Sequence, residues 1–193
     1  FQDAITSMLR TEVTADSIRA RWQNSSGVDS AFMQQAHDLG LNSMLIPESL
    51  GGLGLTAVDF ILLAEACGEV ALPEPLVESV MVTAPSLVDI LDQGLGNADV
   101  QRVIDGVLAG ELRVALGHTI NPHINYADSA DWFLLPDGDG VYLLPKDAVT
   151  LEAKTSVDPS RRLFSVSFAA SDAYLVADGD AGASLQRASL NRG

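Results

Sequence analysis

Residues 39–75 read LGLNSMLIPESLGGLGLTAVDFILLAEACGEVALPEP, and this stretch decides how the first part of the chain folds. Pro47 disfavours helical backbone at Ile46, so a preceding helix is expected to end before this point. Thr56 and Asp59 have the three-residue spacing of a capping box, which predicts that a new helix begins here. The stretch therefore predicts a glycine-rich loop followed by a largely apolar helix.

Gly68 marks the expected C-cap region of this helix, and Pro73 and Pro75 cannot continue it. The loop glycines read G-G-x-G, which is not the G-x-G-x-x-G spacing of a dinucleotide fingerprint. No Gly-Lys-Ser/Thr follows them, so they do not form a phosphate loop either. We therefore predict that the loop glycines have a structural role.

The composition of the chain limits the classes of protein to consider. It has 193 residues, is 47% hydrophobic and carries a formal net charge of −15, which is typical of a globular chain whose main partner is neither a nucleic acid nor an anionic membrane. No signal-peptide pattern and no apolar run of transmembrane length is visible. The single cysteine, Cys67, lies in an apolar run and is predicted to be a buried structural thiol. These features predict a cytoplasmic protein.

Helical spacing continues on both sides of the opening stretch. Asn24–Gly27 read as a turn, and Asp29 or Ser30 is expected to cap a helix that Gly40 ends. Pro85 interrupts a strongly apolar segment, which predicts a bend or two shorter helices there. The further expected helical segments are 5–13, 18–23 (an extension or a second helix), 31–39, 76–91 and 100–108.

Short β-prone runs replace this pattern from Arg113 onward. Asp139-Gly140 stands between two apolar runs and predicts a β-hairpin. We therefore predict an α+β chain with a helical domain over 1–112 and a small antiparallel β domain, barrel-like or sandwich-like, over 113–182. Residues 183–193 are expected to begin a further helical domain.

Three passages of the chain resemble the acyl-CoA dehydrogenase family. Residues 39–75 are similar to the family's "GL…iPEE-GG-G" turn, E-x-G helix and proline-rich turn. Residues 130–135, ADWFLL, resemble its "A-D-W-x-L-V" strand, and residues 156–163, SVDPSRRL, resemble the "D-x-T-R" hairpin before a "V-x-F" strand. The resemblance spans residues 30–193 and implies the acyl-CoA dehydrogenase fold, without most of its C-terminal four-helix domain.

The resemblance also implies a reaction, the α,β-dehydrogenation of an acyl-CoA thioester. In the family a carboxylate base removes the α-proton and FAD accepts a hydride from the β-carbon. The base usually comes from the C-terminal domain, so it is expected beyond residue 193, and more chain is expected in nature because a short terminal helix is marginal. The carboxylates of the first part are predicted to be solvated helix or turn residues: Glu65, Glu69, Glu74 and Glu78.

The flavin loop of the family has no counterpart in this sequence. Residues 115–131 read ALGHTINPHINYADSAD and lack the "T-E-P-x-x-G-S-D" and "G-x-K-x-x-I-T" elements. Such a loss resembles the degenerate subunit of the heteromeric, heterotetrameric acyl-CoA dehydrogenases of actinobacterial steroid degradation. This implies a homologous flavin-competent partner subunit, FAD held mainly by that partner, and an acyl-CoA substrate such as a steroid side-chain CoA ester. The alternative is a non-catalytic scaffold or binding subunit that keeps the fold.

Four residues are candidates for cofactor binding. When the strand that begins at Val114 is matched to the first β-strand of the family, His118 and Thr119 fall where relatives contact the flavin. The alternative is that both residues belong to a solvent-facing or hydrogen-bonded loop. Arg161 or Arg162 can hold a phosphate of FAD or CoA through a bidentate contact. The alternative for the arginines is a salt bridge, for example to Asp158. No metal site is predicted, because the two histidines of the loop lack the spacing of a zinc site.

Overall fold

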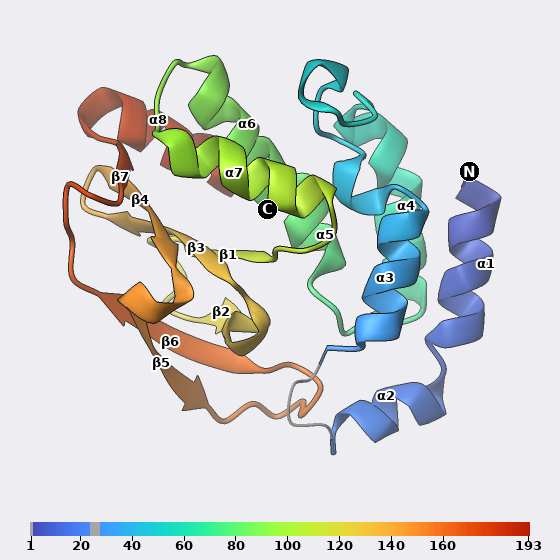
Figure 1. The fold of residues 1–193 in the computed structure, drawn as a ribbon. Helices are drawn as coiled ribbons and strands as arrows, with labels where there is room; N and C mark the ends of the chain where they lie inside the picture. Colours follow the sequence, from blue (N-terminus) through green and yellow to red (C-terminus); the bar gives the residue numbers. More distant parts are fainter. Residues whose placement is uncertain (1, 24–27) are drawn as a thin grey trace.

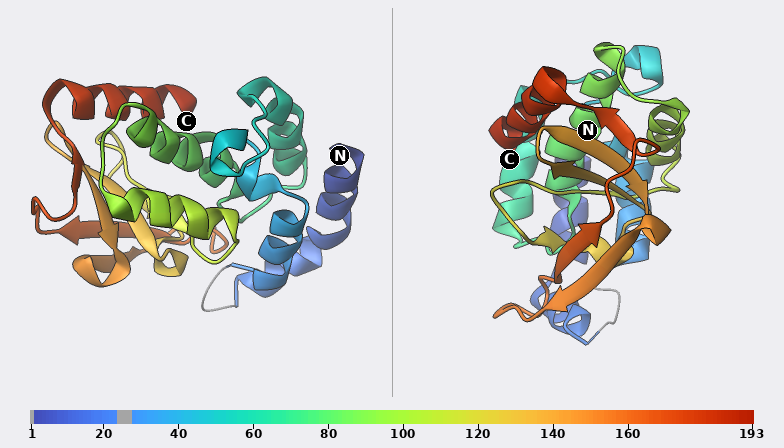
Figure 2. Two further views of the ribbon diagram at one scale, coloured as in Figure 1. Left: turned by 45° about the horizontal axis from the view of Figure 1, so that its top comes forward. Right: turned by 90° about the vertical axis from the view of Figure 1, so that its left-hand side faces the viewer.

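The computed structural model describes residues 2–23 and 28–193, so the turn predicted at 24–27 lies outside the described residues. The N-terminal helices lie on one side of the molecule and the strands on the other, with α6 and α7 between them (Figures 1 and 2). The helices are α1 (Gln2–Glu12), α2 (Ala15–Arg21), α3 (Ser30–Asp38), α4 (Ala57–Glu69), α5 (Leu76–Glu78), α6 (Ala84–Asp92), α7 (Ala98–Leu108) and α8 (Gly179–Arg192). The 3₁₀ turns are η1 (Leu41–Ser43), η2 (Glu48–Leu50), η4 (Ala127–Ser129) and η5 (Lys146–Ala148).

Helix α4 begins as the capping box predicts. The backbone N–H and the hydroxyl of Thr56 donate to Asp59 Oδ2 at 2.8 and 2.7 Å. The helix ends in the expected C-cap region near Gly68: α4 continues to Glu69, Val70 is the C-cap, and the left-handed residue after it is Ala71, with a φ of 52°. The backbone hydrogen bonds at this helix end hold Ala71 in place without a glycine.

Pro85 lies in the first turn of α6, directly after a π-helical segment, η3 (Ser79–Thr83). The expected interruption of the apolar segment is therefore present, and it consists of a wider, π-helical turn between α5 and α6. A proline lacks the N–H that an α-helix needs, so the regular hydrogen-bond ladder is interrupted here. Single π turns within helices are frequent at functional sites.

The strands form two sheets, one with the order β1-β3-β4-β7 and one with the order β2-β6-β5. All strand pairs are antiparallel, as predicted, except that β1 and β3 are parallel. The predicted hairpin is present, but its turn is Gly138-Asp139, one residue earlier, because Gly138 takes the left-handed conformation. The strands are β1 (Val114–Leu116), β2 (Ile124–Asn125), β3 (Trp132–Asp137), β4 (Gly140–Pro145), β5 (Val149–Lys154), β6 (Leu163–Phe168) and β7 (Leu175–Ala177).

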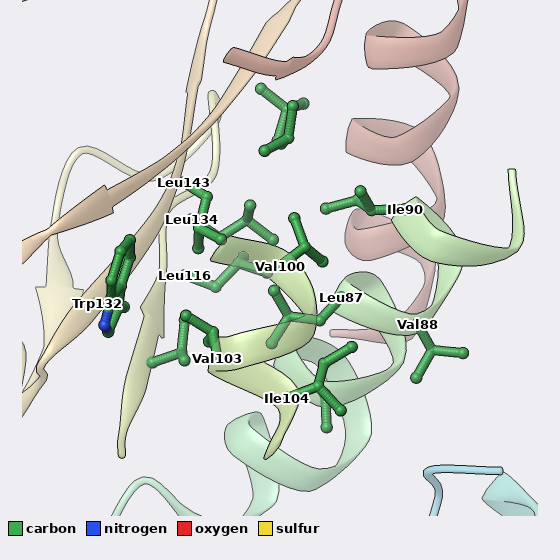
Figure 3. Close-up of a cluster of buried hydrophobic side chains, with 14 of the residues drawn as sticks. Leu87, Val88, Ile90, Val100, Val103, Ile104, Leu116, Trp132, Leu134 and Leu143 are labelled. Carbon is green, nitrogen blue, oxygen red and sulfur yellow. The ribbon is translucent and has the colours of Figure 1, made fainter. Parts of the chain in front are cut away.

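A hydrophobic core joins the helices to the four-stranded sheet. Figure 3 shows side chains of α6 and α7 meeting those of β1, β3 and β4. Val103 and Leu143 are almost completely buried there, and each buried side chain of this size contributes about 1.5–3 kcal/mol. Because this core includes both helices and strands, it fixes β1 and the loop after it against the helical part. The division at residues 112 and 182 stays a prediction.

Helix α8 confirms the expected helix near the C-terminal end of the sequence, although it begins at Gly179 rather than Ser184. The Asp178 side chain accepts the N–H of Gly179 and starts it. Figure 2 shows α8 at the same edge of the molecule as α6. Two side-chain contacts of Arg192 hold it there, with Nη1 and Nη2 at 2.7 and 3.0 Å from the carboxylate of Asp89.

Candidate functional site

A groove of about 890 Å³ opens between α4, α5, the loop from β1 to β2 and the end of α8. One part of its wall is apolar and includes Cys67, Leu72, Val77, Met81, Leu116 and Leu190. Its polar side chains include Glu74, Glu78, His118, His123, Asn125, Tyr126 and Arg161. An apolar wall with a few polar groups is the usual lining of a small-molecule site.

Glu74 is a buried member of an ion pair, so its prediction as a solvated turn carboxylate is wrong. The Glu74 side chain is 0% exposed and that of Arg21, which donates to it, is 5% exposed. Arg21 also lies 3.5 Å from Asp29 Oδ2. The turn between Pro73 and Pro75 carries Glu74 toward α2, a long-range contact that the local sequence does not encode.

Glu78 is half-buried at the end of α5, which also contradicts the prediction that it is solvated. Burial raises its pKa, and a hydrogen bond with Asn125 of β2 opposes this only in part. A sequence signal for this burial existed, because Met81 and Val82, three and four residues later, are on the same face of a helix and also line the groove.

The two flavin-contact candidates predicted in the loop between β1 and β2, His118 and Thr119, have different surroundings. His118 lines the groove, and burial lowers its pKa, which favours the neutral ring. Thr119 is exposed and lies outside the groove lining. The N–H groups of Gly117, Asn121 and His123 donate to oxygens of this chain at 3.0, 3.3 and 3.0 Å. These three donors are therefore already engaged, and the flavin contacts of His118 and Thr119 stay predictions.

The two adjacent arginines have different surroundings. Arg162 donates to Asp128 Oδ2, with Nε at 2.9 Å, so the salt-bridge alternative holds for it, with Asp128 in place of Asp158. Arg161 is exposed and lines the groove, and it forms no ion pair with any residue of 2–23 or 28–193. Of the two, Arg161 is therefore the one available to an anionic ligand, and phosphate binding by either residue stays a prediction.

Tyr126 connects the groove to the hairpin between β5 and β6, a role that the sequence did not reveal. Its backbone has a φ of 53°, and its hydroxyl donates to the carbonyl oxygen of Ser160. Burial raises the pKa of Tyr126 to about 12, so the phenol stays protonated. Ser160 in turn donates to Asp158 Oδ1 at 2.6 Å, which fixes the hairpin beside Arg161.

Cys67 is 3% exposed, which confirms the predicted buried thiol, and burial raises its pKa to about 11. Within residues 2–23 and 28–193, no cluster of His, Cys, Asp or Glu side chains is arranged to hold a metal ion. In the same part of the chain, no helix combines the length and the apolar character that crossing a membrane requires.

Comparisons with known proteins confirm the resemblance. The family model described as "Acyl-CoA dehydrogenase, N-terminal domain" matches residues 1–101. Among solved structures, a variant of the Tcur3481–Tcur3483 steroid ACAD matches with a TM-score of 0.74 at 20% identity, over 98% of this chain and 60% of that chain. The ChsE4–ChsE5 complex from Mycobacterium tuberculosis matches with a TM-score of 0.72 at 19% identity, over 95% of this chain and 57% of that chain.

A third match is the prolyl acyl carrier protein oxidase AnaB, with a TM-score of 0.74 at 11% identity, over 99% of this chain and 61% of that chain. No curated protein sequence matches. At such identities the structural matches show the fold, and the chain spans about 60% of the length of the structures it matches. The family match covers more than half of the 193 residues, and the chain therefore belongs to the acyl-CoA dehydrogenase family.

Proposed function

We propose that this chain is a subunit of a flavin-dependent acyl-CoA dehydrogenase that acts on an acyl-CoA thioester together with a homologous flavin-competent subunit. The observation that carries the proposal is the groove of about 890 Å³, which is lined by apolar side chains and by polar groups of the loop from β1 to β2. An acyl group suits the apolar wall. Arg161, which forms no ion pair with any described residue, suits an anionic part of the ligand.

The flavin is held mainly by the partner subunit. Three observations support this: Thr119 lies outside the groove, Arg162 is paired with Asp128, and the N–H groups of Gly117, Asn121 and His123 are engaged within the chain. When bound in the complex, FAD supplies the hydride acceptor. This chain contributes a wall that excludes water and orients the acyl group, while the base is expected beyond residue 193.

The substrate and the assembly are also part of the proposal. Two of the matched structures are described as a steroid ACAD and as a complex of two named subunits. A steroid side-chain CoA ester and a heterotetramer of two kinds of subunit are therefore the proposed substrate and assembly. Within this chain, residues 1–112 are proposed as the helical domain, 113–182 as the β domain and 183–193 as the start of a further helical domain.

The test is turnover of an acyl-CoA with a dye as electron acceptor, measured on the complex of the full polypeptide with its partner. Val77→Trp narrows the groove and is expected to raise KM roughly tenfold or more, because a filled pocket excludes the acyl group. Val58→Trp is the matched control, since Val58 is 74% exposed and lies outside the groove lining. Equal effects of the two substitutions contradict the proposed use of the groove.

The second candidate is a non-catalytic scaffold that retains the fold. It is favoured by the internal engagement of Arg162 and of the loop N–H groups, which leaves few groups for cofactor chemistry. A partner subunit that turns over acyl-CoA equally well with and without this chain supports the scaffold. Turnover that requires this chain and responds to Val77→Trp rules it out.

A further inference from the structure

Tyr126 holds the backbone on both sides of Arg161. Its hydroxyl donates to the carbonyl oxygen of Ser160, and its backbone N–H donates to the carbonyl oxygen of Arg162 at 2.8 Å. One residue therefore binds the carbonyl groups directly before and after Arg161. The N–H of Arg161 donates in turn to the carbonyl oxygen of Asp158 at 3.0 Å. The backbone of Arg161 is thus fixed, while its side chain is exposed and the residue lines the groove.

The conformation of Tyr126 is unusual for a residue with a side chain. Its φ of 53° lies in the left-handed region, which tyrosine rarely adopts. Such strained residues persist where their surroundings fix them, and they cluster at ligand-binding sites. Tyr126 is also only 3% exposed, so water does not compete for its hydroxyl. The strained backbone and the buried phenol indicate a rigid support for the hairpin between β5 and β6.

Arg161 differs from the other arginine of the groove lining, because it is not in an ion pair. The guanidinium of Arg192 is held by the carboxylate of Asp89 at 2.7 and 3.0 Å. Within residues 2–23 and 28–193, Arg161 is therefore the one lysine or arginine of the groove lining without a carboxylate partner. A guanidinium is always charged, and its planar set of donors matches the oxygens of a phosphate group.

Two carboxylates of the groove lining are already engaged with other residues. Asp158 Oδ1 accepts the N–H and the hydroxyl of Ser160 at 2.9 and 2.6 Å. Glu74 is paired with the buried guanidinium of Arg21. Neither carboxylate forms an ion pair with Arg161, so its guanidinium is left for a ligand of the groove.

We propose that Arg161 binds a phosphate group of the CoA part of the thioester, and that Tyr126 is the positioning residue that holds Arg161 at the groove. The inference rests on the proposed function and says which end of the thioester the hairpin recognises. A side chain on a fixed backbone loses less freedom on binding than one on a flexible loop, so the two contacts of Tyr126 favour phosphate binding. FAD also carries phosphates, and the experiment distinguishes the two sources.

The test measures kcat and KM of the complex of the full polypeptide with its partner, with a dye as electron acceptor. The substrates are an acyl-CoA and the pantetheine thioester of the same acyl group, which has no phosphate. The wild-type complex is expected to show a roughly tenfold lower KM for the acyl-CoA, the effect of one charge-assisted contact. Arg161→Ala is expected to raise this KM roughly tenfold and Tyr126→Phe roughly threefold or more, with kcat within about twofold. Neither substitution is expected to change KM for the pantetheine thioester.

Arg187→Ala and Tyr142→Phe are the matched controls, because Arg187 is exposed and both residues lie outside the groove lining. Both are expected to keep the wild-type ratio of the two KM values. An unchanged ratio in Arg161→Ala overturns the inference. An equal rise of both KM values in Tyr126→Phe shows a merely structural role and overturns the positioning role of Tyr126.

The FAD absorbance of the same complexes distinguishes the two phosphate sources. Loss of FAD from the Arg161→Ala complex, with an unchanged ratio of the KM values, assigns Arg161 to the phosphates of FAD and overturns the inference. In each of these cases, turnover by the wild-type complex leaves the proposed function standing. Turnover of neither thioester by the wild-type complex overturns the proposed function and this inference together.

Discussion

Arg21 of α2 and Glu74 of the turn after α4 form an ion pair from which water is nearly excluded, with exposed side-chain fractions of 5% and 0%. The pair joins the second helix to the segment that borders the groove. Such a pair is costly to break, because removing one partner leaves the other charge buried and uncompensated. The position of the groove wall therefore depends on a contact between residues 53 apart in the sequence.

Glu74→Leu is expected to lower the free energy of unfolding by about 3 kcal/mol, the low end of the range for breaking a buried pair, since Arg21 loses its buried counter-ion and keeps only the more exposed Asp29 at 3.5 Å. The measurement is urea denaturation of the full polypeptide. Glu69→Leu is the control. Glu69 is 57% exposed and forms a long surface ion pair with Arg10, at 3.6 Å, and such a pair contributes at most about 1 kcal/mol to stability. Equal losses in the two variants contradict the buried pair.

Two helical glycines are expected to respond in opposite directions to substitution by alanine. A Cβ at Gly182 would lie 1.9 Å from the carbonyl oxygen of Asp139, so α8 and the hairpin must separate, at a cost of about 1–3 kcal/mol or more. A Cβ at Gly68 meets nothing within 4 Å, so Gly68→Ala is expected to stabilise by about 0.5–1 kcal/mol. Thermal unfolding of both variants measures the sign of each change in stability. Destabilisation by Gly68→Ala would contradict the free space beside Gly68.

Glu78 makes stability depend on pH. Because burial raises its pKa above the usual 4.5 of a glutamate, the folded state holds this proton more tightly than the unfolded state. The contribution of Glu78 is fully present below pH 4.5 and is lost as the pH rises through the raised pKa. Relative to wild type, Glu78→Gln is therefore expected to gain stability as the pH rises from 4.5 to neutral. Denaturation midpoints of both proteins across this range test the sign, and parallel curves refute it.

Asp89 and Arg192 anchor the end of α8 to α6 through two contacts of 2.7 and 3.0 Å. Their side chains are 26% and 30% exposed, so water screens the pair only in part. A double-mutant cycle with Asp89→Asn and Arg192→Gln is expected to give a coupling energy of about 1 kcal/mol. Faster hydrogen exchange in α8 should accompany either substitution, and a coupling energy near zero would show that this ion pair does not anchor the helix.

The elements that the sequence predicted are those encoded by neighbouring residues. The capping box of Thr56 and Asp59, the helix between Asp29 and Gly40 and the hairpin near Gly138 each depend on a few adjacent positions. The order of helices and strands was therefore predictable, and the family resemblance added the fold. The turn of the hairpin was misplaced by one residue, because both Gly138 and Gly140 suit a turn and only the strand register decides between them.

Long-range contacts account for what the sequence did not predict. Glu74 is buried by Arg21, and Arg162 is paired with Asp128, which is 34 residues away. The parallel pairing of β1 with β3 likewise joins segments that local patterns leave free. Of the four predicted cofactor residues, the structure brings His118 and Arg161 to the groove and leaves Thr119 and Arg162 outside its lining. Their roles stay predictions until a ligand is bound.

We propose that this chain works as a dehydrogenase subunit whose flavin is held mainly by a partner. The most direct measurement is the flavin absorbance of the full polypeptide, purified alone and with a homologous flavin-competent subunit. We expect no stoichiometric FAD in the isolated chain, because its loop N–H groups and Arg162 are already engaged, and bound FAD in the complex. Tight, stoichiometric FAD in the isolated chain would contradict the account.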